Sequence, residues 1–201
     1  AGFNTKPGEG YSYVCQTLDM GISYYRLVYA RLTGEPFVVA ETKNLLIREM
    51  TTKDLPELYA VYSTLEDCRY IEQLYDYDKE LEFTKNYIKN MYGFFEYGLW
   101  LVFEKKSGEL IGRAGIENRE IDGVTCCEIG YLIRRDMQHK GYAYEACQAI
   151  LEYASDELGI QEMFAVIDKT NEPSRKLAQK LGFELYAQTD GGPDLYKFVF
   201  G

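Results

Sequence analysis

The chain has 201 residues, a formal net charge of -10 and 46% hydrophobic residues. This length and composition suit one full globular domain with a sizeable core, plus a further short segment. Acidic residues outnumber basic ones by 32 to 22, which argues against nucleic-acid binding through a broad cationic surface. We find no run of about eighteen apolar residues and no signal-peptide pattern, so no membrane-spanning segment is expected. Five cysteines without framework spacing indicate reduced thiols and a cytoplasmic protein.

Residues 1–40 are predicted to form an N-terminal extension, or the tail of an upstream domain, with one helix. Apolar residues over 19–32 have the spacing of an amphipathic helix, and Gly34 with Pro36 supplies a stop signal. Residues 37–40 are apolar and predict a short extended piece. The main domain is therefore expected over residues 41–201.

This domain is predicted to open with a strand over 45–50 and two helices. Thr52 is expected to cap the first helix, and a second helical pattern covers 79–95. The apolar face of the first helix holds Leu55, Leu58, Tyr59 and Tyr62. The region from 55 to 95 is thus expected to be mostly helical.

The second half of the domain alternates strands and helices. Turn signals separate three predicted strands, over 99–104, 110–117 and 124–133, which should form an antiparallel meander. Small apolar residues along 142–158 predict a helix that can lie close on a sheet. The remaining predicted elements are a strand over 163–168, a short helix over 173–180, and two final strands over 183–187 and 195–200.

A short polar segment, Gln138-His139-Lys140-Gly141-Tyr142-Ala143, connects the third strand of the meander to the long helix. A strand that passes through such a loop into a helix leaves backbone N–H groups unpaired at the positive end of the helix dipole. Gly141 allows a ligand close to the backbone, and Ala143 keeps the first turn small. Basic side chains surround the segment at Arg134, Arg135, His139 and Lys140. We predict a phosphate or pyrophosphate site here, with an ordinary strand-to-helix turn as the alternative.

Two segments together carry a family resemblance. Residues 138–143 fit the pattern Gln/Arg-x-x-Gly-x-Gly/Ala, and a segment from Asn171 fits Asn-x-x-Ser followed by a short helix and Leu-Gly-Phe. In this order and at this separation they resemble the cofactor segments of the GNAT acetyltransferases, in particular the ribosomal-protein N-terminal acetyltransferases. The resemblance implies an α/β (α+β) fold, with a mixed, mostly antiparallel central sheet whose splayed central strands are flanked by helices.

The resemblance also implies a cosubstrate, acetyl-CoA, lying between the splayed strands. By this similarity the phosphate loop, including Gln138 and Tyr142, would hold the pyrophosphate, and backbone amides near Ile133 would polarise the thioester carbonyl. Asn171 matches the residue that hydrogen-bonds the pantetheine arm, although it could equally cap a helix. Ser174 matches a residue that contacts the sulfur or the pantetheine.

Acetyl transfer to an amine requires a general base, because an alkyl amine with a pKa of about 10 is protonated at neutral pH. Glu117 is the preferred candidate, since it ends a strand that would line the gap; a solvated glutamate is the alternative. Glu128 is the second candidate, and as a carboxylate within an apolar strand it is better explained by a structural hydrogen bond.

The group that protonates the leaving thiolate is harder to assign. The family often places a Tyr on the helix after the Asn, whereas this chain has Ala178 and Gln179 near that place. Ser174 is the remaining candidate, and a role in starting the helix explains it equally well. The sole histidine, His139, lies in the phosphate loop, which disfavours a Ser/His/Asp triad. No Cys-x-x-Cys or His-rich spacing indicates a metal.

These observations lead to one functional hypothesis and one alternative. The chain is predicted to be an N-acetyltransferase that moves an acetyl group from acetyl-CoA to the primary amine of a small molecule or peptide by direct transfer. The alternative is a non-catalytic acyl-CoA-binding or sensor module. Neither a nucleic acid nor a membrane is expected as a partner, and the sequence leaves open a homodimer or an upstream domain.

Overall fold

The computed structural model describes residues 21–65, 69–121 and 123–201. The chain divides into two compact units, Ala1–Phe37 and Val38–Gly201, which are described separately. In the first unit α2 spans Gly21–Thr33, as expected from the pattern over 19–32, whose first two positions lie outside the described residues. The second unit contains the sheet and every other described helix.

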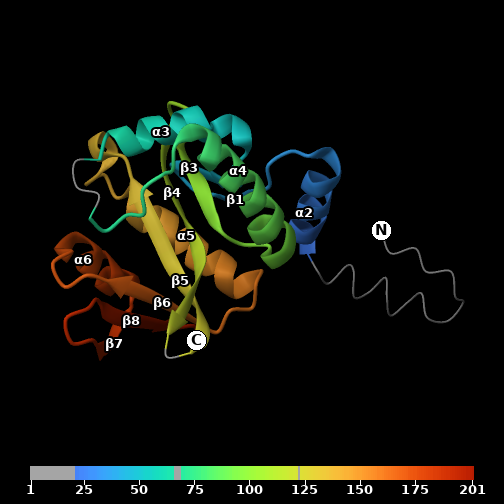
Figure 1. Cartoon of the computed structure of the whole chain (residues 1–201). Helices are drawn as coiled ribbons and strands as arrows, with labels where there is room; N and C mark the ends of the chain where they lie inside the picture. Colours follow the sequence, from blue (N-terminus) through green and yellow to red (C-terminus); the bar gives the residue numbers. More distant parts are fainter. Residues whose placement is uncertain (1–20, 66–68, 122) are drawn as a thin grey trace, which may run out of the picture. The chain divides into compact units, whose positions relative to one another are not determined.

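The sheet of the second unit has eight strands in the order β1-β2-β3-β4-β5-β6-β8-β7 (Figure 1). Every neighbouring pair is antiparallel except β5 and β6, which are parallel. The strands are β1 (Val38–Glu41), β2 (Leu45–Arg48), β3 (Leu99–Glu104), β4 (Leu110–Ile121), β5 (Val124–Ile133), β6 (Glu162–Ile167), β7 (Glu184–Gln188) and β8 (Asp194–Val199). The mixed, mostly antiparallel sheet expected from the sequence is confirmed.

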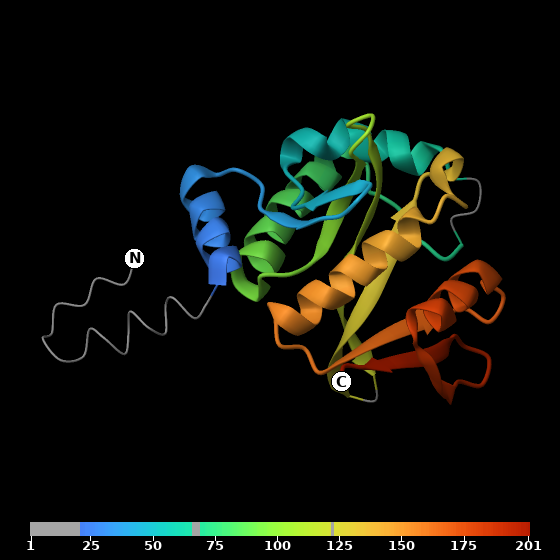
Figure 2. The ribbon, with the colours of Figure 1, turned by 180° about the vertical axis from the view of Figure 1, so that it is seen from behind.

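Helices cover both faces of the sheet. They are η1 (Thr52–Asp54), α3 (Leu55–Ser63), α4 (Tyr77–Tyr87), η2 (Ile88–Phe95), η3 (Arg135–Met137), α5 (Tyr142–Asp156) and α6 (Glu172–Leu181). On one face, Tyr62 of α3 approaches Arg113 of β4. On the other face, the ring of Tyr153 in α5 packs 5.4 Å from that of Trp100 in β3, and α5 lies in front of the strands when the molecule is turned (Figure 2).

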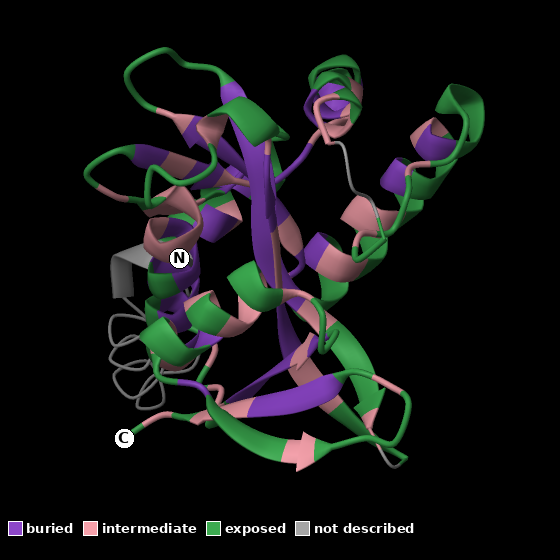
Figure 3. Ribbon diagram, turned by 90° about the vertical axis from the view of Figure 1, so that its left-hand side faces the viewer, coloured by how far each residue is buried: buried purple, intermediate pink, exposed green. Residues whose placement is uncertain are grey.

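The core follows the central strands (Figure 3). The inward face of α5 is built from small residues, as predicted, and Ala146, Cys147, Ile150 and Ala154 are fully buried. Small side chains allow the helix to approach the sheet closely, because no long side chain holds the two apart. α5 thus packs directly on β4 and β5.

Several predicted boundaries differ from the structure. β4 continues to Ile121, because its residues beyond Glu117 go on pairing with β5. The helical pattern over 79–95 is divided into α4 and η2, and η2 is a π-helix that ends where Glu96 takes a left-handed conformation. The prediction that Thr52 caps the first helix is wrong. Thr51 occupies the N-cap position of η1, where its N–H donates to Asp54 Oδ2 over 2.7 Å, and Asp54 occupies that of α3.

β5 and β6 diverge from a single point. Among the described residues their register partners are Glu128 and Phe164, and residues 129–133 of β5 have none on β6. The strands separate towards the start of α5 on one side and the start of α6 on the other (Figure 1). The splayed central strands that the family resemblance implies are therefore present.

Candidate functional site

The gap between β5 and β6 forms part of a cleft of about 1350 Å³. Its lining comes from α3, α4 and the segment before it, from β3, β4, β5 and β6, and from the start of α5 and α6. Nine of the eleven residues predicted to bind a cofactor line it, namely Ile133, Arg135, Gln138, His139, Gly141, Tyr142, Ala143, Asn171 and Ser174. The two predicted segments, far apart in the sequence, thus lie on one cleft, and only Arg134 and Lys140 are absent from its lining.

The loop before α5 presents a series of free backbone donors. Among the hydrogen bonds of the described residues, none uses the N–H groups of residues 139–144. His139 and Gly141 both have positive φ, 60° and 88°, which turns the chain sharply into the helix. A Cβ added at Gly141 would meet no atom within 4 Å. The space beside these donors is therefore open to an anion at the positive end of the α5 dipole.

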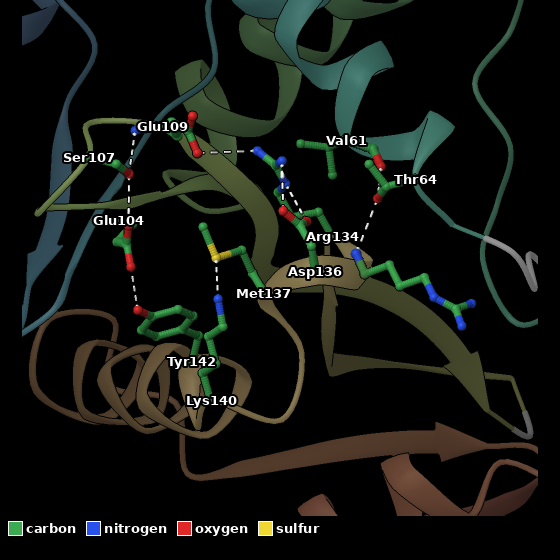
Figure 4. A network of polar contacts seen from close by, with 11 residues as sticks. Val61, Thr64, Glu104, Ser107, Glu109, Arg134, Asp136, Met137, Lys140 and Tyr142 are labelled. Atoms are coloured by element: carbon green, nitrogen blue, oxygen red, sulfur yellow. Dashed lines mark hydrogen bonds and ion pairs between the residues drawn. The ribbon is translucent and has the colours of Figure 1, made fainter.

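The basic island predicted around this loop is smaller than the sequence indicated (Figure 4). Arg134 Nε donates to Asp136 Oδ1 over 2.7 Å, and its Nη1 lies 3.5 Å from Glu109 Oε2. Lys140 Nζ lies 3.1 Å from Met137 Sδ. Because two carboxylates neutralise Arg134, it has little charge to offer an anion. The free backbone N–H groups therefore contribute more to anion binding at this site than the basic side chains do.

The side chains of Glu145 and Tyr142 hold the start of α5 in place, and the sequence analysis missed both. Glu145 Oε1 accepts from Thr42 Oγ1 over 2.6 Å and from Asn44 N over 2.8 Å, which joins the first turn to the loop between β1 and β2. The Tyr142 hydroxyl donates to Glu104 at the end of β3 (Figure 4). Such contacts between distant segments leave no local pattern in the sequence.

At the opposite side of the gap, Asn171 caps α6. Its Oδ1 accepts from Ser174 N over 3.3 Å. Asn171, and not Ser174, is therefore the residue whose side chain caps this helix.

Tyr131 of β5 is the residue here that sequence reasoning missed. Its hydroxyl is buried and has no hydrogen-bond partner among the described residues. Burial raises the pKa of Tyr131, and the Ser174 side chain opposes part of that rise, which places Ser174 next to the phenol.

Glu117 lines the cleft on the α3 side of β4. It is the direct register partner of Glu128 on β5, and no hydrogen bond or ion pair joins its carboxylate to any described residue. Burial raises the pKa of Glu117, and the negative charges of Glu128 and Glu72 add to the rise, whereas Arg113 opposes it. A half-buried, unpartnered carboxylate that is driven towards its neutral form can accept a proton from a bound group.

Glu128 is held by partners, as its position in an apolar strand indicated. Its Oε2 accepts from Arg119 Nε over 2.6 Å, and its Oε1 accepts from Val166 N over 3.3 Å. The second contact bridges β5 and β6 just beyond the last paired residues, where the main-chain ladder stops. Glu128 therefore stabilises the point at which the strands diverge.

The described residues contain no cluster of His, Cys, Asp and Glu suited to a metal ion. Within that same part of the chain, no helix has both the length and the apolar character needed to cross a membrane.

Comparison with known proteins matches residues 44–184 to the Acetyltransf_3 family, described as an acetyltransferase (GNAT) domain. The chain belongs to the GNAT acetyltransferase family. It is 33% identical over 134 residues to YkkB, an uncharacterized protein of Bacillus subtilis, covering 67% of this chain and 72% of YkkB. It is also 33% identical over 143 residues to YnaD, an uncharacterized N-acetyltransferase of the same organism, covering 70% of this chain and 79% of YnaD.

Solved structures show the same GNAT fold. RimL, a ribosomal L7/L12 α-N-protein acetyltransferase, superimposes with a TM-score of 0.69 at 15% identity, over 82% of this chain and 95% of RimL. RimL has also been solved in complex with coenzyme A, and that structure superimposes with a TM-score of 0.64. The resemblance drawn from the two sequence segments is thus confirmed at the level of family and fold.

Proposed function

We propose that this GNAT protein is a cytoplasmic N-acetyltransferase that moves an acetyl group from acetyl-CoA directly to a primary amine. The observation that carries the proposal is the position of Glu117. This unpartnered carboxylate lines the same cleft as the free N–H groups at the start of α5. A site for the anionic end of a cosubstrate and a proton acceptor thus share one cavity.

The residues present fit acetyl-CoA. The free N–H groups of residues 139–144 suit a pyrophosphate, with Arg135, His139 and Gly141 lining the same part of the cleft. The unpaired edge of β5 over 129–133 offers main-chain groups to an extended arm, since those residues have no described partner on β6. Asn171 and Ser174 stand at the other side of the gap. RimL, which has this fold, binds coenzyme A.

Glu117 acts as the general base in this proposal. It takes a proton from the ammonium form of the acceptor, directly or through a water, and leaves a neutral nitrogen that can attack the thioester. The C–N bond forms as the C–S bond breaks, and backbone N–H groups near Ile133 stabilise the charge on the carbonyl oxygen.

Tyr131 supplies the proton to the departing thiolate, and the second proton that the attacking nitrogen loses on forming the amide restores the phenol through water. Its hydroxyl lies buried on the strand that edges the gap, and burial keeps it protonated. Ser174 stands beside it, from the helix on which the family often places a Tyr. A phenol on β5 would therefore perform the role for which α6 offers no Tyr.

A calorimetric titration followed by an amine screen tests the proposed function. We expect acetyl-CoA to bind with micromolar affinity, about -8 kcal/mol, and at least one primary amine to release free CoA thiol and form an N-acetyl product detectable by mass. Failure of the folded protein to bind acetyl-CoA would contradict the proposal. Binding that no amine converts into turnover would favour the non-catalytic acyl-CoA-binding module instead.

A further inference from the structure

Arg113 is a buried cation that has no counter-ion among the described residues. Its side chain on β4 is only 7% exposed, and its Nε is buried with no hydrogen-bond partner. No carboxylate of the described residues lies within ion-pair distance of it. The side-chain hydrogen bond that Arg113 makes to the Tyr62 hydroxyl is long, 3.5 Å from Nη1, and Tyr87 also lies beside the guanidinium.

Such a group is costly, because burial removes water from a guanidinium that has five donors to satisfy. Its surroundings are phenols: Tyr62 of α3, Tyr87 of α4 and Tyr92 of η2 all act on Arg113. Tyr87 and Tyr92 do not neutralise the charge at neutral pH, since burial raises the pKa of Tyr87 to about 12 and raises the pKa of Tyr92 well above its usual value. Tyr87 already accepts a hydrogen bond from Leu99 N over 2.6 Å.

Arg113 faces the cleft that contains Glu117. The two residues lie four positions apart on β4, so their side chains share one face of the sheet, with about 13 Å between the Cα atoms. Both line the cleft together with Tyr62 and Tyr87. One end of this part of the cleft therefore carries an unpartnered base, and the other carries a guanidinium without a counter-ion among the described residues.

We propose that the acceptor is an amine that also carries a carboxylate, so that Arg113 binds the carboxylate while Glu117 takes the proton of the amine. This rests on the proposed function and narrows its substrate class to amino acids. A planar guanidinium matches a carboxylate through two parallel N–H···O bonds, and the bound anion satisfies the Nε that has no partner in the structure. Simple polyamines lack the carboxylate that Arg113 would bind.

The competing account gives Arg113 a structural role, in which it only moderates the acidity of Glu117 through its charge. That account predicts no difference between an acceptor and its decarboxylated counterpart. Binding of matched pairs to the CoA-saturated protein separates the two accounts. The pairs are phenylalanine with phenethylamine, lysine with cadaverine, and γ-aminobutyrate with propylamine.

We expect at least one carboxylate member to bind about tenfold or more tightly than its amine partner. Arg113→Met should abolish this preference while leaving the affinity for CoA unchanged, and unchanged CoA affinity shows that the variant is folded. Arg113→Lys, which keeps the charge but not the planar fork, should retain only part of the preference.

Equal affinities within every pair, including the absence of binding by both members, would overturn the inference. So would a carboxylate preference that survives Arg113→Met. A phosphoethanolamine preference over ethanolamine that exceeds every carboxylate preference would overturn the choice of a carboxylate. Failure of CoA itself to bind would contradict the proposed function rather than this inference.

Discussion

Glu117 and Glu128 face each other across β4 and β5, yet their surroundings differ. Glu128 is held by Arg119 and by Val166 N, whereas Glu117 has no described partner and its pKa is raised by burial. Only the unpartnered carboxylate can change protonation state without breaking a contact. Glu128 is thus a structural glutamate, whereas Glu117 is free for proton transfer.

Glu117→Gln should lower kcat by about 10²- to 10⁴-fold while leaving acetyl-CoA affinity unchanged.

The base must be ionised to work, so in the unmodified protein kcat/KM should fall as the pH drops through the pKa of Glu117. Because burial raises that pKa, the fall should occur above the usual glutamate value of about 4.3. A pH–rate profile checks this, and the residual activity of the variant should lack the acidic limb. Unchanged turnover in the variant would remove Glu117 from the mechanism.

Tyr131→Phe removes the proposed acid and little else, because the hydroxyl makes no hydrogen bond in the described structure. We expect kcat to fall by about tenfold to a hundredfold, less than for the base, since a thiolate leaves readily without full protonation. The melting temperature should stay the same or rise, because an unsatisfied buried hydroxyl is lost. Ser174→Ala is the matched comparison. A larger loss of turnover in Ser174→Ala than in Tyr131→Phe would assign the acid to Ser174.

Sequence reasoning identified residues that belong to a local pattern and missed those defined by their surroundings. Glu117 was identified because it ends an apolar strand expected beside the gap. Tyr131 and Arg113 look like ordinary strand residues in the sequence, and their importance depends on what lies opposite them. A hydroxyl or guanidinium without a partner cannot be recognised until the neighbouring elements are placed.

At the scale of elements, the start of α5 combines a loop with two positive φ angles and a first turn fixed by Glu145 and Tyr142. The strand, the loop and the helix were all predictable from apolar periodicity and from Gly141. The distribution of charge was not, because Arg134 is paired with Asp136 and Glu109, and Glu109 is distant in the sequence. The cluster of basic residues in the sequence therefore overestimates the positive charge that is available to bind an anion.

Gly141→Asp tests this element, with Gly141→Asn as the control. Asp and Asn have the same shape and both tolerate the left-handed conformation at φ 88°, so only the charge differs. We expect the Asp variant to lose acetyl-CoA affinity by about a hundredfold and the Asn variant by less than tenfold, measured by calorimetry. The difference should shrink at high salt, because ions screen exposed charges. Equal losses in both variants would show that shape, not charge, governs the loop.

At the scale of the whole molecule, the order of elements was predictable and the divergence of β5 and β6 was predicted only by family resemblance. Periodicity identifies two strands, but it does not indicate that they pair only at Glu128 and Phe164. The bridge from Glu128 to Val166 N, a contact across 38 residues of chain, marks where pairing stops. The feature on which the cleft depends is thus a long-range property of the sheet.

The division of the chain leads to a prediction about truncation. The cleft is lined by residues between Tyr62 and Pro193, and the first unit ends at Phe37. Deleting residues 1–36 should therefore leave acetyl-CoA affinity unchanged within about twofold, as measured by calorimetry.

Deleting residues 1–41 is the informative comparison, because it also removes β1 and exposes the edge of β2, whose Leu45 and Ile47 are fully buried. An uncovered edge invites pairing with other chains and loses ladder hydrogen bonds worth about 0.5–1.5 kcal/mol each. This variant should melt at a lower temperature and aggregate, whereas the shorter deletion should remain monodisperse in light scattering. Loss of acetyl-CoA binding in the shorter deletion would show that residues 1–36 belong to the functional domain and do not form a separable extension.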